Sequence, residues 1–258
     1  MAQDNSVNKV VFFVLGMCLV AALVIALLRE GTYNIAVKNE EIFNKRAVLA
    51  SIEDALPLGE NESVADLNDQ AVLDIFSSSM DQVVLDGSGQ PLEGVLAEDI
   101  DTAKEKKKED SEKRHPLFIY NGEKEKLYIV SLRGNGLWDE IWGYVALSSD
   151  LNTIFGAAFD HKGETPGLGA EIKDSPYFPE RFKGKKIINE EGEYVSVLVQ
   201  KGGADKGDFH AVDGISGATV TANGVTEMLY RGLQYYLPYF RTLQADQPQP
   251  TRMGLLVD

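Results

Sequence analysis

The hydrophobic pattern opens with an apolar run from Val10 to Leu28 that contains no charged or strongly polar residue. A helix rises about 1.5 Å per residue, so this run reaches roughly the thickness of the hydrocarbon core of a membrane. We therefore predict a transmembrane helix over residues 10–28, preceded by an N-terminal tail over residues 1–9. A cleaved signal peptide is the alternative, but the run exceeds a usual h-region and Ala26–Glu30 offers no small-x-small cleavage site.

Residues 29–116 mix helical and charged patterns, and we predict a helical stalk and an accessory segment there. Apolar residues recur among charges from Thr32 to Leu56, as in a helix that packs one face on a domain. Pro57 and Gly59 are expected to end this helix. The apolar spacing from Val64 to Met80 predicts a second helix.

The stretch from Ala97 to Arg114 is dominated by Lys, Glu and Asp and has few residues to bury. Its lysine cluster, Lys104–Lys108, could suggest a lipid or nucleic-acid site, but charges of both signs follow it. We therefore predict a solvated helix or loop. The net charge of −15 also argues against a nucleic-acid binder, because phosphate contacts require an excess of Lys and Arg.

From Leu117 the pattern changes to short β-rich segments. Their ranges are 117–120, 127–130, 142–147, 153–159 and 194–200. The first four form two pairs separated by turn residues, which predicts two hairpins. Strands joined by short loops make antiparallel sheets. We therefore predict an α+β fold, with a twisted antiparallel sheet flanked by helices over residues 117–243.

The sequence from Asp213 to Thr219 leads into an amphipathic helix. The apolar positions of this helix are Val225, Met228, Leu229, Leu233, Tyr236 and Leu237. Thr219 lies near the helix start, where free N–H groups and the positive end of the helix dipole favour a phosphate. The alternative is that Ser216 or Thr219 is an ordinary N-cap.

Other chemistry has little support in the sequence. The single cysteine, Cys18, lies in the apolar run, so it can form no disulfide within the chain and no Cys-based metal site. The three histidines lack metal-ligand spacing, and Ser216 lacks the glycine spacing of a hydrolase nucleophile. We interpret Asp160, His161 and Glu164 as hydrogen-bonding support for a loop. No catalytic residue or metal ligand is predicted.

Four blocks of sequence resemble the FMN-binding domain family. They are Gly134-Asn135-Gly136-Leu137-Trp138, Gly163-Glu164-Thr165-Pro166-Gly167-Leu168-Gly169, Lys201-Gly202-Gly203 and Asp213-Gly214-Ile215-Ser216-Gly217-Ala218-Thr219. The last block resembles the family's flavinylation motif, in which the final Thr carries FMN through a phosphoester bond. With the N-terminal apolar helix, the set is similar to the C subunits of sodium-translocating NADH:quinone reductases.

The resemblance implies covalent FMN on Thr219 and a set of residues around it. By their place in these blocks, the other cofactor-binding residues are Ser216, Gly217, Ala218, Gly136, Leu137, Trp138, Glu164, Thr165, Gly167, Leu168, Gly169 and Lys201. Glycines permit close backbone approach to a planar ring, and Leu137 and Leu168 can cover its face. Two of these residues have alternative interpretations. Trp138 could instead be an aromatic residue of the core, and Lys201 could be an ordinary solvated lysine.

The function implied by the resemblance is electron transfer within a membrane oxidoreductase that also translocates sodium. Its partners are the other subunits and a separate flavin transferase, and its soluble domain is periplasmic on the bacterial inner membrane. One alternative is the flavin subunit of the related ferredoxin–NAD reductase (Rnf-type) complex. Another is a membrane-tethered, non-redox binding or assembly module.

Residues 244–258 are predicted to be a C-terminal tail that is ordered only by a partner.

Overall fold

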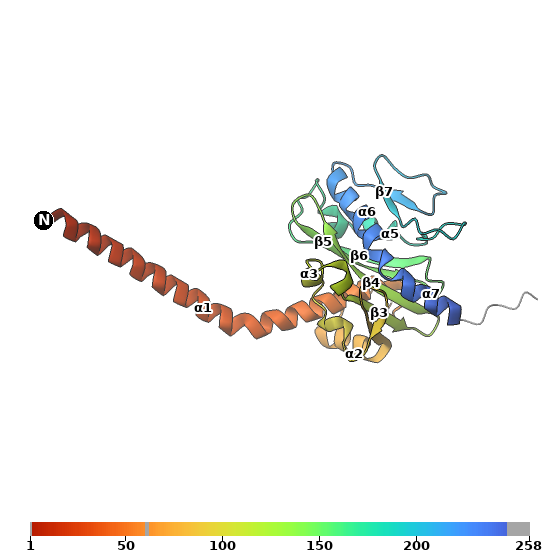
Figure 1. Ribbon diagram of the computed structural model, residues 1–258, viewed down its shortest axis with the longest axis horizontal. Helices are drawn as coiled ribbons and strands as arrows, with labels where there is room; N and C mark the ends of the chain where they lie inside the picture. Colours follow the sequence, from red (N-terminus) through yellow and green to blue (C-terminus); the bar gives the residue numbers. More distant parts are fainter. Residues whose placement is uncertain (1, 60–61, 247–258) are drawn as a thin grey trace, which may run out of the picture. The chain divides into compact units, whose positions relative to one another are not determined.

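The computed structural model describes residues 2–59 and 62–246 (Figure 1). The chain divides into two compact units, one up to Asn44 and one from Lys45 onward. Most of helix α1, Ala2–Ala50, makes up the first unit. The apolar side chains of this helix, such as Phe12 and Leu19, are exposed, and the helix is long and apolar enough to cross a membrane.

Helix α1 includes the described part of the predicted tail, the predicted membrane helix and most of the predicted stalk. No proline interrupts these residues, so nothing in the sequence forces a break between them. The stalk helix ends at Ala50 and not near Pro57 as predicted. A turn follows, with the 3-10 helix η1 at Glu53–Ala55, and Leu49 and Ile52 are both fully buried beside it.

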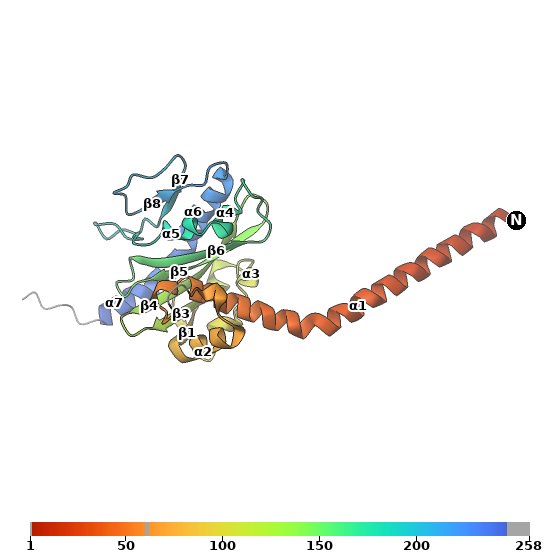
Figure 2. The same ribbon diagram turned by 180° about the vertical axis from the view of Figure 1, so that it is seen from behind.

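The second unit is built on a six-stranded antiparallel sheet (Figure 2). Its strands are β1 Met80–Leu85, β2 Pro91–Leu92, β3 His115–Asn121, β4 Lys126–Asn135, β5 Glu140–Leu147 and β6 Ile154–His161. Their order in the sheet is β2-β1-β3-β4-β5-β6. Both predicted hairpins are confirmed: β3 pairs with β4, placing Leu117 opposite Val130, and β5 pairs with β6, placing Val145 opposite Ala157.

Both faces of this sheet are covered, and alternation along the strands assigns each residue to one of two cores. In β3, Leu117 and Ile119 belong to one core, whereas Phe118 and Tyr120 belong to the other. Helices α4 Glu171–Asp174, α5 Tyr177–Glu180, α6 Thr219–Gln234 and α7 Leu237–Asp246 contribute to the first core. The end of α1 and helix α2, Asp69–Ser79, contribute to the second (Figures 1 and 2).

Helix α2 is shorter than the predicted helix over 64–80. The chain first forms a 3-10 turn, η2 at Val64–Asp66, and α2 then starts after Asn68. The Asn68 side chain accepts a hydrogen bond from the backbone N–H of Ala71 at 2.9 Å, which is the contact of an N-cap.

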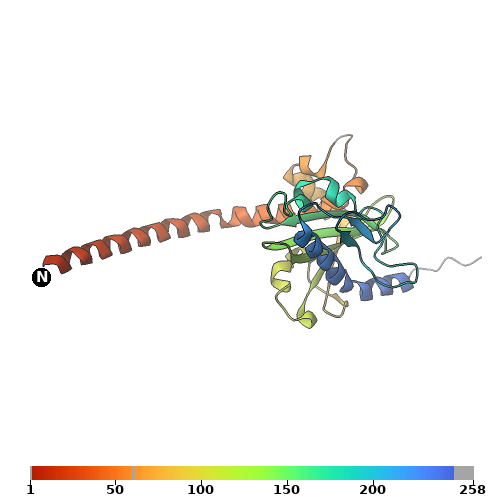
Figure 3. The same ribbon diagram turned by 90° about the horizontal axis from the view of Figure 1, so that it is seen from above.

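The helix predicted after Thr219 is two helices and not one. Helix α6 ends at Gln234, the chain bends, and α7 follows at an angle (Figure 3). Pro238 explains the break, because it has no N–H to donate to the carbonyl four residues earlier. Tyr236 at the bend is fully buried, and its hydroxyl lies within hydrogen-bond distance of two carbonyl oxygens, that of Pro116 at 2.9 Å and that of Ser131 at 3.1 Å.

Residues 244–246 of the predicted tail belong to α7, and 247–258 lie outside the described residues.

The extended run predicted over 194–200 is reduced to strand β7, Leu198–Gln200, which pairs in parallel with β8, Ala211–Asp213. Ser196 has φ of +62°, a left-handed conformation that cannot continue a strand. The second unit therefore adds a small parallel pair to the antiparallel sheet.

The charged stretch after β2 forms short turns, with η3 at Ala97–Asp99, α3 at Thr102–Glu105 and η4 at Asp110–Glu112. Asp101 caps α3, because its side chain accepts hydrogen bonds from the N–H groups of Ala103 and Lys104 at 3.0 and 3.1 Å. Most of the stretch is exposed, as predicted, but Lys106 reaches back onto the sheet.

Candidate functional site

The turn before α6 leads into a helix start that no side chain of the described residues caps. The Ala218 N–H donates to the Ile215 carbonyl at 3.2 Å, and Gly217 has φ of +84°, which together make a type II turn. Ala218 occupies the N-cap position. The alternative in which Ser216 or Thr219 serves as the N-cap is therefore wrong. The first N–H groups of α6 have no partner within the helix, which suits an anion.

Two threonines in this first turn have different surroundings. Thr221 is 0% exposed, and its hydroxyl lies 2.6 Å from Glu164 Oε2 and 3.2 Å from the Leu168 carbonyl. Thr219 is half-buried, and within the described residues its hydroxyl makes no hydrogen bond. The hydroxyl of Thr221 is therefore occupied by hydrogen bonds in the interior, whereas that of Thr219 is available for a bond to a ligand.

The carboxylate of Glu164 joins three separate segments. It is 6% exposed and accepts hydrogen bonds from the N–H groups of Leu137 at 3.2 Å and Trp138 at 3.0 Å, besides the Thr221 hydroxyl. Burial alone would raise the pKa of Glu164, but the hydrogen bonds from Thr221, Trp138 and Leu137 outweigh it and lower the pKa below its ordinary value of 4.5. An ionised carboxylate therefore ties the β4–β5 loop and the loop after β6 to the start of α6.

Two glycines allow these segments to approach closely. A Cβ on Gly136 would lie 2.5 Å from Glu164 Oε1, and one on Gly217 would lie 2.6 Å from the Gly167 carbonyl. Both distances are shorter than real Cβ contacts. Any other residue at either position would therefore push the loops apart.

The aromatic and aliphatic side chains of these loops are exposed. Trp138 is 66% exposed, Leu168 is 40% exposed, and Val220 in the first turn of α6 is 53% exposed. The alternative in which Trp138 is a core aromatic is therefore wrong. An apolar set beside free helix N–H groups is what a planar, phosphorylated ligand requires.

The remaining predicted residues lie around the same turn. Thr165 and Gly167 are exposed, and the Thr165 carbonyl accepts from the N–H groups of Leu168 and Ala170. Lys201 is exposed, and the Gly214 N–H donates to the carbonyl of the preceding Gln200 at 2.8 Å. The backbone thus brings the Lys201 segment to the beginning of the 213–219 turn.

Two residues that hold the site were not predicted. Glu171 accepts hydrogen bonds from the N–H groups of Gly167, at 2.5 Å, and Gly169, at 3.2 Å. Arg181 donates to the carbonyls of Asp213 and Gly214 at 2.8 and 3.1 Å. The position of Glu171, two residues after Gly169, is a weak sequence signal for its contact with the loop. The sequence contains no signal for the contact of Arg181.

The interpretation of Asp160 and His161 as loop support is confirmed. Asp160 accepts from the His161 N–H at 2.7 Å and pairs with Lys173 at 2.8 Å, and His161 Nδ1 accepts from the Glu164 N–H at 3.1 Å. Across residues 2–59 and 62–246, no group of three or more His, Cys, Asp or Glu side chains is placed to hold a metal ion.

Comparisons with known proteins agree with this geometry. The FMN-binding domain family matches residues 136–234, from the β4–β5 loop to the end of α6. The C subunit of the Na(+)-translocating NADH-quinone reductase of Vibrio campbellii is 30% identical over 240 residues, which cover 87% of this chain and 90% of the relative.

Two solved structures share the fold. The C subunit of the Na(+)-translocating NADH-quinone reductase from Parabacteroides distasonis has a TM-score of 0.67 and 36% identity, over 80% of this chain and 95% of that one. The Shewanella oneidensis NqrC structure has a TM-score of 0.66 and 27% identity, over 80% and 99%.

The fold and the site together define an FMN-binding domain that follows an apolar N-terminal helix. The sequence covers that domain and most of the length of its relatives. The chain belongs to the family of C subunits of the Na(+)-translocating NADH-quinone reductase, and it is a subunit of that membrane oxidoreductase. The predicted family and the predicted α+β fold are both confirmed, and the quinone reductase is favoured over the ferredoxin–NAD reductase complex.

Proposed function

We propose that this subunit carries one FMN, joined through its phosphate to Thr219 Oγ1. The single observation that carries the proposal is the contrast between two hydroxyls in one helical turn. Thr221 is buried and bonded, whereas the Thr219 hydroxyl, at the N-terminus of α6, has no hydrogen-bond partner among the described residues. A phosphoester on Thr219 places the phosphate oxygens beside the unpaired N–H groups of that helix. Lys201, whose segment adjoins the turn, adds a positive charge on this side.

The remaining predicted residues then surround the flavin ring. Trp138, Leu137 and Leu168 supply apolar contact, and the glycines at 136, 167, 169 and 217 let the backbone approach it. Ser216 and Thr165 supply polar groups at its border, and Ala218 and the Glu164 carboxylate hold the backbone of the site from the interior. Because Glu164 is saturated by N–H and O–H donors, its charge fixes the loops and leaves the ring chemistry to the cofactor.

Bound FMN accepts and releases electrons, and the chain holds it where other subunits can exchange electrons with it. We propose that α1 anchors the subunit in the bacterial inner membrane as a single span and that the domain from Lys45 onward lies on the periplasmic side. Anchoring serves the function by raising the effective concentration of the docking surfaces. The non-redox tether is the alternative, and it predicts no flavin on the chain.

Removal of residues 1–28 tests the role of the anchor. The domain should still fold and accept FMN, because its two cores are formed by residues from Lys45 onward. Quinone reduction by the complex in cells should be lost, since the flavin is no longer held near its partners. Val20→Asp should act like the deletion, because a charge at the centre of a membrane helix costs about 3 kcal/mol on insertion scales.

Val20→Leu is the matched control for this experiment and should assemble normally. Complex assembly and NADH-driven quinone reduction are measured with exported, flavinylated protein in each case. Normal turnover of the truncated subunit would show that contacts of the domain alone position the flavin.

The chain is also expected to depend on a separate flavin transferase. It contains no nucleotide-binding motif with which to bind FAD and modify itself. In the transfer, the Thr219 oxygen forms a bond to the flavin-side phosphorus of FAD and loses its proton to a base of the transferase, and AMP leaves with the electron pair of the broken pyrophosphate bond. Expressed in a host without the transferase, the full chain should fold without flavin. With the transferase present, its band on a denaturing gel should fluoresce.

The denaturing gel separates three outcomes. Fluorescence only with the transferase supports the proposal. Fluorescence after incubation of the purified chain with FAD alone refutes the need for a transferase. A band without fluorescence, both for chain expressed with the transferase and for chain purified from its native membrane, refutes the proposal of a flavin carrier and favours the non-redox tether.

A further inference from the structure

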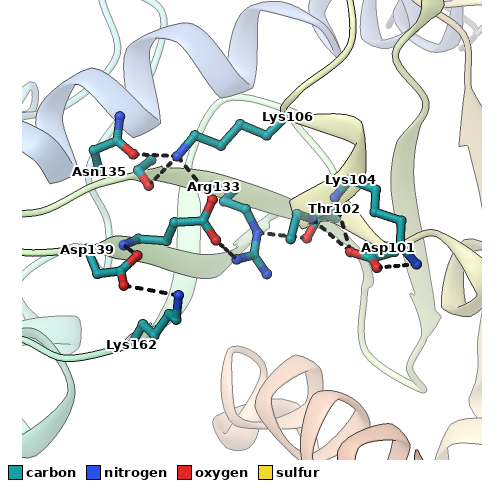
Figure 4. Close-up of polar contacts among 11 residues, drawn as sticks. Asp101, Thr102, Lys104, Lys106, Arg133, Asn135, Asp139 and Lys162 are labelled. Atoms are coloured by element: carbon teal, nitrogen blue, oxygen red, sulfur yellow. Dashed lines mark hydrogen bonds and ion pairs between the residues drawn. The ribbon is translucent and has the colours of Figure 1, made fainter.

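Lys106 connects the charged stretch after β2 to the base of the β4–β5 hairpin (Figure 4). Its ammonium donates to the Gly134 carbonyl at 3.0 Å and to the Asn135 side-chain oxygen, and it lies 3.4 Å from Glu140 Oε1. Gly134 and Asn135 end β4, and Glu140 begins β5. One ammonium therefore bridges both strands of the hairpin at the point where its loop starts.

Contacts on either side hold this bridge in place. Glu140 Oε2 pairs with Arg133 at 2.9 Å, and Arg133 Nε donates to the Thr102 hydroxyl at 3.1 Å. Thr102 is the first residue of α3, the helix that Asp101 caps. Figure 4 shows Arg133 pointing toward Thr102 and Lys106 pointing toward Asn135. Lys106, Glu140 and Arg133 are all largely shielded from solvent, where such ion pairs are stronger than at the surface.

The hairpin loop is fixed at its other end by Glu164. The Glu164 carboxylate accepts the N–H groups of Leu137 and Trp138, and the Gly136 N–H donates to the Asp139 carbonyl at 2.8 Å. Four loop residues are thus held between two charged groups, Lys106 at the base and Glu164 at the tip. The side chain of Trp138 is mostly exposed, so its position depends on the backbone that carries it.

We propose that Lys106 is a positioning residue of the flavin site, which sets the place of Leu137 and Trp138 against the ring through the hairpin base. This inference rests on the proposed function. It assigns the segment 101–106, far from the flavinylation motif in sequence, to the cofactor site. Supporting groups that fix the geometry of residues in contact with a cofactor have large effects on it.

The test compares Lys106→Met with Lys108→Met in the full chain. Lys108 belongs to the same stretch but pairs with Glu105 in its own turn at 2.8 Å. In flavin-free protein, amide hydrogen exchange of residues 134–139 should become about tenfold faster in Lys106→Met and stay unchanged in Lys108→Met. In flavin-loaded protein, Lys106→Met should lose about half of the visible circular dichroism of the flavin, with the FMN content retained.

Lys106→Arg keeps donors at the same place and should restore most of both signals. Asn135→Ala removes only one exposed acceptor of the bridge and should show a smaller change in the same direction. Unchanged exchange and unchanged flavin dichroism in Lys106→Met, at equal FMN content, would overturn the inference. FMN content is measured separately on denatured protein, and a wild-type chain without FMN would refute the proposed function. The hydrogen-exchange result on flavin-free protein would still show whether Lys106 holds the β4–β5 hairpin loop.

Discussion

Thr219→Val should yield a folded subunit without covalent flavin. The hydroxyl of Thr219 makes no hydrogen bond in the part of the chain that the structure describes, and a β-branched valine has nearly the same shape. The melting temperature should therefore stay close to that of the flavin-free wild type. Flavin fluorescence on a denaturing gel should disappear, because the acceptor atom of the phosphoester is gone. The complex should then lose quinone reduction.

Thr221→Val is the matched control in the same helical turn. It should retain FMN but lose about 2 kcal/mol of stability, because a buried hydrogen bond to a charged carboxylate is removed. Chemical denaturation and FMN content measured on both variants separate the two effects. Retained FMN in Thr219→Val together with loss in Thr221→Val would move the attachment site to Thr221.

Glu164→Ala should destabilise the domain by about 3 kcal/mol and disorder the flavin site. The substitution leaves the partly buried N–H groups of Leu137 and Trp138 without their acceptor, and it removes the hydrogen bond between Glu164 and Thr221 of α6. Denaturant unfolding gives the stability, and FMN content gives the effect on attachment. Glu190→Ala, an exposed carboxylate far from these loops in sequence, should change neither. A Glu164→Ala protein with wild-type stability would contradict the role of the carboxylate.

The same carboxylate gives a direction for pH dependence. The pKa of Glu164 is lower in the folded domain than its ordinary value of 4.5, so the ionised form is the one that stabilises the fold. This contribution is fully present above the ordinary pKa and is lost as the pH falls through the lower pKa of the folded state. The acid-induced loss of stability should therefore be smaller in Glu164→Ala than in the wild type.

Patterns that depend on near neighbours could be predicted from the sequence. The β-rich segments 117–120 and 127–130 flank the turn residues Asn121-Gly122, which predicts the hairpin, and the glycine turn before Thr219 predicts the start of α6. Features that depend on packing could not be predicted in this way. The Ser196 backbone conformation shortens the strand expected over 194–200, and no neighbouring residue signals it. The break between α6 and α7 is different, because Pro238 is a local signal that the apolar spacing outweighed in the prediction.

The site shows the same limit. The sequence identified the loops that contain Trp138 and Leu168, and it predicted Glu164 both as hydrogen-bonding support and as a cofactor-binding residue. The structure confirms the support and identifies its partners, since Glu164 accepts hydrogen bonds from three backbone and side-chain donors in two other segments. Lys106 was predicted to be solvated, because no local pattern shows that a lysine in a charged run contacts residues about thirty positions away.

The most direct measurement is peptide mapping by mass spectrometry on the full chain purified from membranes of its native host. We expect one FMN moiety attached to each chain, and fragmentation should place it on Thr219. An unmodified chain would contradict the proposal of a covalent flavin, and a modification on Ser216 or Thr221 would contradict the assignment of the acceptor.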